Sequence, residues 1–246
     1  MNKFFYIAAG IITFMVFILV MAPASLLMSM AGDSLQKVPD LKIGRVDGRI
    51  WAGSTELQYQ GFPARVSWNL AALPLVLGQV SADVEVTGDG LDADFHVSAN
   101  SQEGRITGAT AVVDARYINQ VSVGYGLDLS GQFSFTSDEI SFNNQWVTAA
   151  IGNLDWPGGI VHIETPERLH SVDLPPMIGE VSMDGEAVQL AINNERTSMI
   201  DLSLKPNGWA AVGVSFAFIE LAGLPIPLDA RTDVAGPALL IEEKVL

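Results

Sequence analysis

Asp92, Asp94 and His96 are the residues whose types and spacing come closest to a metal or catalytic site. They stand two positions apart in a strand-like segment, so their side chains would project from one face, about 6.5–7 Å apart. A metal would need all three to converge on it. The alternative is the solvated face of an amphipathic hairpin, which the acidic composition favours. We therefore predict no metal site at these positions.

His162 and Glu164 form a second pair on one strand face, and His170 follows in the next segment. Nothing in the sequence requires these two segments to meet. Neither a G-x-S-x-G elbow, a phosphate-binding P-loop nor an H-E-x-x-H motif occurs, and the absence of cysteine removes thiolate chemistry and disulfides. Carboxylate pairs such as Glu242 and Glu243 lack the predicted burial that a general acid needs. These observations predict a protein that is not an enzyme and has no cofactor.

The composition excludes one class of partner. The chain has 246 residues, 49% of them hydrophobic, which is enough for a sizeable core. Its 13 basic and 28 acidic side chains give a formal net charge of −15, which repels a polyanion. We therefore predict no nucleic-acid partner. A large extracytoplasmic domain without disulfides is typical of a bacterial periplasm.

The N-terminal segment predicts a membrane anchor. No charged residue occurs from Phe4 to Gly32, and about 20 apolar residues suffice to cross a bilayer. Lys3 places the N-terminus inside the cell. A cleaved signal peptide ending near Ala22-Pro23-Ala24 is the alternative, but the apolar stretch is longer than a usual signal core. The anchor residues that we expect to face lipid are Phe4, Ile7, Ile11, Phe14, Phe17 and Val20.

Three regions follow from this topology. We predict a cytoplasmic tip and transmembrane anchor over residues 1–30, a stalk over 31–41 and a periplasmic β-rich domain over 42–246. The predicted location is the bacterial inner membrane, crossed once, with most of the chain in the periplasm.

After the anchor the hydrophobic pattern has a period of two. Val80–Val86 and Leu91–Val97 alternate strictly and flank Gly88-Asp89-Gly90, which predicts a hairpin with one apolar face. Asp47-Gly48, Asp184-Gly185 and Asn207-Gly208 are further hairpin-type dipeptides. Other predicted strands are Thr55–Gln60, Ala64–Trp68, Gly131–Thr136, Gly159–Thr165, Gly179–Met183, Ala187–Ile192, Met199–Lys205 and Ala211–Phe218. Short helices are predicted at Asn69–Leu77 and Val112–Val121. The expected fold is mainly β: an antiparallel, curved sheet with one or two short helices.

We expect three tryptophans either to fill the corners of the sheet or to line an apolar groove. Trp51 and Trp156 each lie between glycines at strand ends, and Trp68 ends a predicted strand. Rings at such positions fill sheet corners. Alternatively, they line an apolar groove left open for an acyl chain or a partner strand, and an exposed sheet edge is itself a template for β-augmentation.

The order of these elements resembles the type II secretion system protein N family. Gly48-Arg49-Ile50-Trp51-Ala52-Gly53 resembles its G-x-[VI]-W-x-G opening. Val66-Ser67-Trp68-Asn69-Leu70, followed by Leu73, Leu77 and Gly78, is similar to its V-x-W-x-L segment. Gly152-Asn153-Leu154-Asp155-Trp156 resembles its central G-x-L-x-W element, and Leu174–Val181 with Asp184-Gly185 resembles its later strand pair.

The resemblance implies a single-pass inner-membrane component of the apparatus that exports folded proteins across the outer membrane of Gram-negative bacteria. Its expected partners are other inner-membrane type II secretion subunits. The family also looks similar to AsmA/TamB-type proteins, whose curved sheets form a groove implicated in lipid traffic. A lipid-binding or lipid-transfer groove, with membrane lipid as partner, is therefore the alternative function. A metal-dependent hydrolase using Asp92, Asp94 and His96 is a third alternative.

Overall fold

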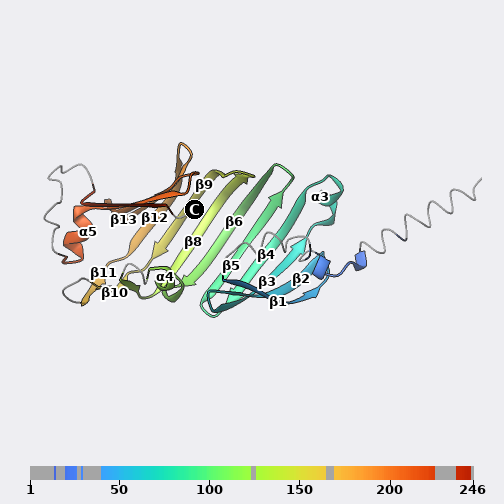
Figure 1. The fold of residues 1–246 in the computed structure, drawn as a ribbon, viewed down its shortest axis with the longest axis horizontal. Helices are drawn as coiled ribbons and strands as arrows, with labels where there is room; N and C mark the ends of the chain where they lie inside the picture. Colours follow the sequence, from blue (N-terminus) through green and yellow to red (C-terminus); the bar gives the residue numbers. More distant parts are fainter. Residues whose placement is uncertain are drawn as a thin grey trace, which may run out of the picture. The chain divides into compact units, whose positions relative to one another are not determined.

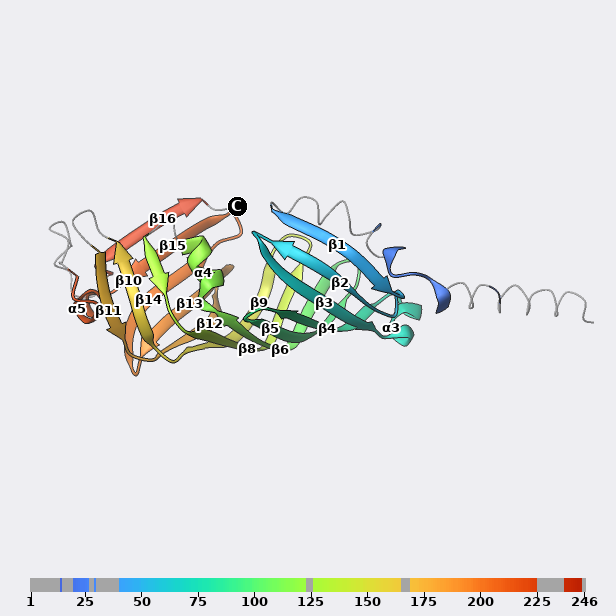
Figure 2. The same ribbon diagram turned by 90° about the horizontal axis from the view of Figure 1, so that it is seen from below.

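From residue 40 onward, the described part of the chain folds mainly as antiparallel β-sheet with three short helices (Figures 1 and 2), which confirms the predicted fold class in its main part. The computed structural model describes residues 14, 20–26, 29, 40–122, 126–164, 169–224 and 237–244. These residues form two compact units. Unit 1 comprises residues 1–89 and 96–101, and unit 2 comprises residues 90–95 and 102–246, so each is described separately.

Unit 1 is a run of consecutive antiparallel strands. The strands are β1 (Leu41–Gly48), β2 (Ala52–Tyr59), β3 (Phe62–Leu70) and β4 (Val80–Gly88), with the short helix α3 (Ala72–Val76) between β3 and β4. The next strand, β5 (Leu91–Ala99), belongs to unit 2 up to Phe95 and to unit 1 from His96. The register sets Trp68 opposite Gly53 on one side and Val84 on the other, so apolar residues share one face of the sheet.

Unit 2 contains most of the larger sheet and all of the smaller one. Its larger sheet runs, in order, through β6 (Glu103–Asp114), β8 (Gln132–Asn143), β9 (Val147–Trp156), β12 (Met177–Asp184), β13 (Ala187–Asn194), β14 (Thr197–Leu204), β15 (Trp209–Val214) and β16 (Leu239–Lys244). The smaller sheet has the order β11 (Leu169–Leu174), β10 (Gly159–Glu164) and β7 (Leu127–Leu129). The helices are α4 (Ala115–Ser122) and α5 (Phe216–Leu221).

A closed core joins the two sheets of unit 2. Val161 and Ile163 of β10 pack with Trp156 and Met177 of the larger sheet, and Ala222 at the end of α5 joins the same cluster. The smaller sheet and α5 therefore form a second layer over the apolar face of β9 and β12. Each fully buried side chain of this size contributes roughly 1.5–3 kcal/mol to folding.

Unit 1 has no comparable layer among the residues that the structure describes. Its only described helix within the strand run, α3, contacts β4, and residues 22–24 bind at the β1–β2 end through the Pro23–Arg49 bridge. In β1–β4 only Thr55 and Ala82 are buried, and the other apolar side chains keep part of their surface exposed.

Several predicted boundaries were wrong. The predicted strand Ala211–Phe218 ends at Val214, because Ser215 caps α5 by accepting a hydrogen bond from the Phe218 amide. The predicted helix Val112–Val121 begins only at Ala115, since β6 pairs with β8 as far as Asp114. The helix predicted over Asn69–Leu77 is limited to α3, since β3 pairs with β4 up to Leu70.

Two of the predicted hairpin dipeptides lie in turns. Gly185 (φ 59°) follows the last residue of β12, and Gly208 (φ 82°) precedes β15. Asp47-Gly48 instead remains inside β1, and the chain turns after it. The predicted strands Val80–Val86 and Leu91–Val97 fall within β4 and β5.

No described helix is long and apolar enough to cross a membrane. Of the predicted anchor residues, Phe4, Ile7, Ile11 and Phe17 lie outside the described residues. Phe14 and Val20 are described as helical and exposed. The anchor and the stalk stay predictions.

Candidate functional site

Asp94 and His96 make hydrogen bonds to different residues and do not form a common site with Asp92. The Thr110 hydroxyl donates to the Asp94 carboxylate at 2.8 Å within unit 2. The His96 ring contacts residues of β4 within unit 1. The described part of the chain contains no group of three or more acidic or histidine side chains arranged to hold a metal ion.

Ser81, His96 and Asp83 form a hydrogen-bonded chain that the sequence did not reveal. His96 Nδ1 lies 2.8 Å from Asp83 Oδ1, and His96 Nε2 lies 3.1 Å from Ser81 Oγ. The connectivity is that of a hydrolase triad, in which the acid is buried and orients the imidazole. Here the Asp83 side chain is 76% exposed and that of His96 is 42% exposed. Water competes for both groups, so the arrangement corresponds to an exposed polar contact on the sheet.

The histidines of unit 2 are also separated. His162 of β10 lies opposite Ser171, and the next residue, Ile163, lies opposite His170. Because neighbouring positions of a strand project to opposite faces, His162 and His170 point away from one another. The Nδ1 atom of His162 is buried and has no hydrogen-bond partner among the described residues.

Trp68 explains the glycine at position 53. Its indole N–H donates to the Ile50 carbonyl at 3.0 Å, which holds the ring across the start of β2. A Cβ atom on Gly53 would lie 2.6 Å from Cζ2 of this ring and 2.7 Å from the Asp47 carbonyl oxygen. The glycine is therefore required sterically. Trp51 lies in the preceding turn, is partly buried, and its carbonyl accepts a hydrogen bond from the Leu70 amide at 2.6 Å.

Trp156 lies in the closed core of unit 2. The residue is 6% exposed, and its indole N–H donates to the Ser130 carbonyl at 2.9 Å. Its ring stacks on Phe133 with centroids 5.8 Å apart and planes 9° from parallel. Its location is thus that of a core-filling aromatic, whereas Trp68 lies on the less covered sheet of unit 1.

The best-formed candidate surface of unit 1 is the apolar face of β1–β4, which we call the open face. It comprises Leu41, Ile43, Val46, Leu57, Tyr59, Phe62, Val66, Trp68, Leu70, Val84 and Val86. All of these side chains retain some exposure, and Tyr59 is 47% exposed. Thr55 and Ala82 lie on the same face and are buried. The partly exposed apolar side chains around them are suited to an acyl chain or to the apolar side of a partner.

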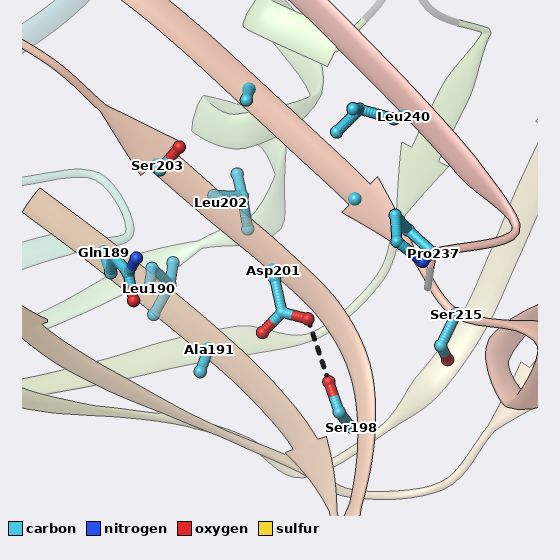
Figure 3. Close-up of a pocket in the computed structure, with 12 residues that line it drawn as sticks. Gln189, Leu190, Ala191, Ser198, Asp201, Leu202, Ser203, Ser215, Pro237 and Leu240 are labelled. Carbon is cyan, nitrogen blue, oxygen red and sulfur yellow. Dashed lines mark hydrogen bonds between the residues drawn. The ribbon is translucent and has the colours of Figure 1, made fainter. Parts of the chain in front are cut away.

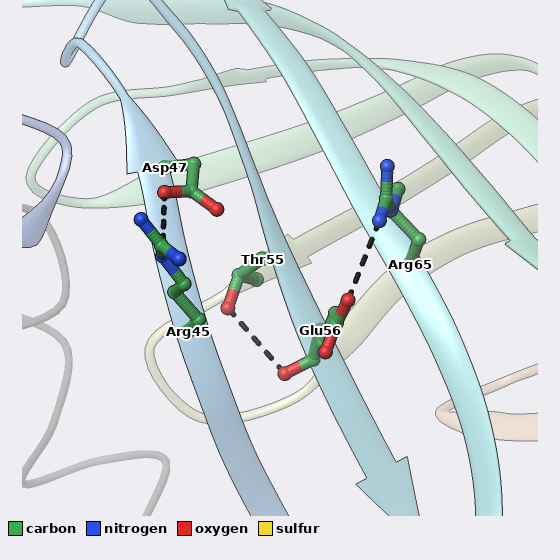
Figure 4. A network of polar contacts seen from close by, with 5 residues as sticks. All are labelled: Arg45, Asp47, Thr55, Glu56 and Arg65. Atoms are coloured by element: carbon green, nitrogen blue, oxygen red, sulfur yellow. Dashed lines mark hydrogen bonds and ion pairs between the residues drawn. The ribbon is translucent and has the colours of Figure 1, made fainter.

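The opposite face of the same strands is charged (Figure 4). Arg45 pairs with Asp47 at 2.9 Å and Arg65 with Glu56 at 3.3 Å. Both pairs are well exposed, and pairs of this kind contribute about 0–1 kcal/mol each. Unit 1 is therefore a strongly amphipathic sheet, with its charges facing water.

Unit 2 carries a shallow cavity of about 490 Å³ over β13–β16, lined by both apolar and polar side chains (Figure 3). Asp201 lies on its floor and accepts a hydrogen bond from the Ser198 hydroxyl at 3.1 Å. Gly213 of β15 pairs with Asp201 of β14 on one side and with Leu240 of β16 on the other. Because glycine has no side chain, this position leaves space that forms part of the cavity. One exposed carboxylate surrounded by hydroxyl groups does not make a catalytic set.

Comparison with known proteins identifies the family. The family model for type II secretion system protein N matches residues 39–219, which extend from just before β1 into α5. No curated protein and no solved structure matches the chain. Since the family model covers most of both units, this chain belongs to the type II secretion system protein N family.

Proposed function

We propose that this protein is a non-enzymatic inner-membrane component of the type II secretion system. In this proposal one N-terminal helix anchors the chain, its N-terminus is cytoplasmic, and the β-rich part acts in the periplasm. The observation that carries it is the family match over residues 39–219. The uncharged segment from Phe4 to Gly32 supports the anchor.

The surfaces of the two units, each taken by itself, support a role in contacting other subunits. Unit 2 has a closed core and therefore presents a stable surface, while unit 1 presents an amphipathic sheet. Other inner-membrane secretion subunits are the expected partners.

Deletion of the gene, followed by complementation with the full chain, tests this function. We expect the deletion strain to retain the exported enzymes in the periplasm and to lose normal assembly of the inner-membrane subunits. Complementation with the double variant Ser81→Ala/His96→Ala, which removes the exposed polar contact, should restore export as well as the native chain does. Normal export and assembly in the deletion strain would refute the proposal.

A lipid-binding groove is the second candidate, and the open face of unit 1 favours it. Partly exposed apolar side chains over four strands could hold an acyl chain. Val66 and Ser67 are neighbours on β3 that project to opposite faces, which provides a matched pair of variants.

The full chain would be purified in detergent and its co-purifying phospholipid measured by mass spectrometry. We expect Val66→Asp to lose bound phospholipid and Ser67→Asp to retain it. Equal phospholipid content in both variants would show that the open face does not hold lipid.

A further inference from the structure

The two outermost strands of the larger sheet differ in how their free edges are protected. β1 pairs only with β2, and β16 pairs only with β15, among the described strands. Each edge strand presents backbone N–H and C=O groups on its unpaired side. Proteins normally protect such edges with bulges, charges or proline, because another strand can pair there.

β1 carries these protective features. Its register with β2 shifts between Ile43 and Val46, which places a bulge at the edge. Lys42, Arg45 and Asp47 add charged side chains on the same strand. A further strand would therefore pair poorly with β1.

β16 lacks both a bulge and proline. Its register with β15 is continuous, from Trp209 opposite Lys244 to Val214 opposite Leu239. Every residue of the strand is exposed, and three consecutive apolar side chains, Leu239, Leu240 and Ile241, are 41%, 56% and 41% exposed. Glu242, Glu243 and Lys244 place charges on the other half of the strand, so the apolar half, with its regular register, is the part of the edge that a partner strand can cover.

The charges around β16 indicate what kind of partner fits. A strand added beside β16 would place one residue directly opposite Glu242, where a basic side chain is favoured. Apolar residues would lie opposite Leu239, Leu240 and Ile241. A second copy fits less well, because each copy carries a net charge of −15 and its β16 has two acidic residues and one basic residue, Lys244.

We propose that β16 is the docking edge for an extended segment of another secretion subunit, which adds to the sheet as a further strand. The segment has three successive apolar positions next to a basic one. This inference rests on the proposed function, because it takes the partner from the secretion apparatus. The backbone pairing supplies affinity, and the side chains opposite β16 supply selectivity.

The test uses the full chain at its native level in cells with the complete apparatus. A photo-crosslinking amino acid replaces Leu240 in one strain and Lys42 of β1 in another. We expect an adduct with an identified secretion subunit from position 240, and none from position 42. Peptide mapping should place the crosslink in an apolar segment next to a basic residue.

Leu239→Lys combined with Ile241→Lys then adds charges to the edge. We expect the adduct yield from position 240 to fall about tenfold, as follows from the loss of apolar contacts. The matched control, Leu73→Lys/Leu77→Lys around α3, also changes two exposed leucines and should leave the yield unchanged.

Three results would overturn the inference: an adduct from position 240 with a second copy of this chain, an adduct with lipid only, or no adduct. Unchanged yield in the lysine variant with a normally folded chain would also overturn it. Each of these results can occur while gene deletion still blocks export, in which case the proposed function stands. Normal export after deletion refutes the proposed function instead.

Discussion

Replacing Gly53 by alanine tests whether this glycine is required by the position of Trp68. The new Cβ atom would lie 2.6 Å from Cζ2 of Trp68 and 2.7 Å from the Asp47 carbonyl oxygen. Both separations are well below van der Waals contact, so either the ring or the backbone of β1 must move. Gly53 has no positive φ, so the steric contact is the only strain introduced.

The expected cost follows from these contacts. Overpacking costs about 1–3 kcal/mol. Movement of the ring also lengthens the 3.0 Å hydrogen bond from Trp68 to the Ile50 carbonyl, and its loss costs about 0.5–1.5 kcal/mol. Alanine also lowers the conformational entropy of the unfolded chain, which offsets about 0.4–1 kcal/mol of this cost. We expect Gly53→Ala to lower the free energy of unfolding by about 2 kcal/mol.

The assay is urea unfolding of the purified full chain in detergent, followed by circular dichroism. Hydrogen exchange of the β2 and β3 amides assigns the transition to unit 1. A double-mutant cycle with Trp68→Leu should reduce the cost of Gly53→Ala by at least about 1 kcal/mol, because the ring is no longer present. Gly61→Ala is the control: no atom lies within 4 Å of its added Cβ, and only its φ of 95° is strained.

The reasoning would be refuted by an equal cost of Gly53→Ala with and without the Trp68→Leu change. A cost below about 0.5 kcal/mol, which is typical of ordinary surface substitutions, would refute it as well.

Three further substitutions test other contacts. Trp156→Phe removes the 2.9 Å hydrogen bond to the Ser130 carbonyl and part of a buried ring, so the free energy of unfolding of unit 2 should fall by about 1–3 kcal/mol in urea titrations; an unchanged midpoint would contradict the core role. Asn119→Ala breaks the paired hydrogen bonds to the Leu129 backbone, at 2.8 and 2.7 Å, and should speed hydrogen exchange in β7 and α4 without slowing export. His96→Ala should change stability by less than about 0.5 kcal/mol and leave export normal, and a stable variant that fails to export would show that this exposed histidine has a function.

Strict alternation was a good guide to the strands. Val80–Val86 and Leu91–Val97 fall within β4 and β5, because one polar and one apolar face is what a half-buried strand needs. The same pattern misled at Phe216 and Phe218, where Ser215 caps a helix. There the hydrogen bond from the Phe218 amide to the Ser215 side chain starts a helix, although the alternation of apolar residues predicts a strand.

Other strands were missed because their sequences carry weak signals. β6 contains Gly104, Gly108 and two alanines, and β9 contains Ala149, Ala150 and Gly152. Small residues have low intrinsic β propensity. These strands form because their neighbours pair with them: β8 runs beside both β6 and β9.

The candidate site was only partly predictable. The sequence placed Asp92, Asp94 and His96 on one strand, but it did not show that His96 binds Ser81 and Asp83 of β4. Such contacts depend on the register between strands, which no single segment encodes. The contrast between a bulged β1 and a regular β16 depends on the register in the same way.

By itself, the sequence determined that this is a mainly β, acidic protein with amphipathic strands, and the order of its tryptophan and glycine elements pointed to its family. Only the tertiary structure decided what covers each apolar face. In unit 2, β7, β10, β11 and α5 complete a closed core around Trp156, whereas no described strand or helix forms a second layer over β1–β4. The reason is physical: alternation shows that one face of a strand avoids water, but the element that excludes the water comes from elsewhere in the chain or from a partner.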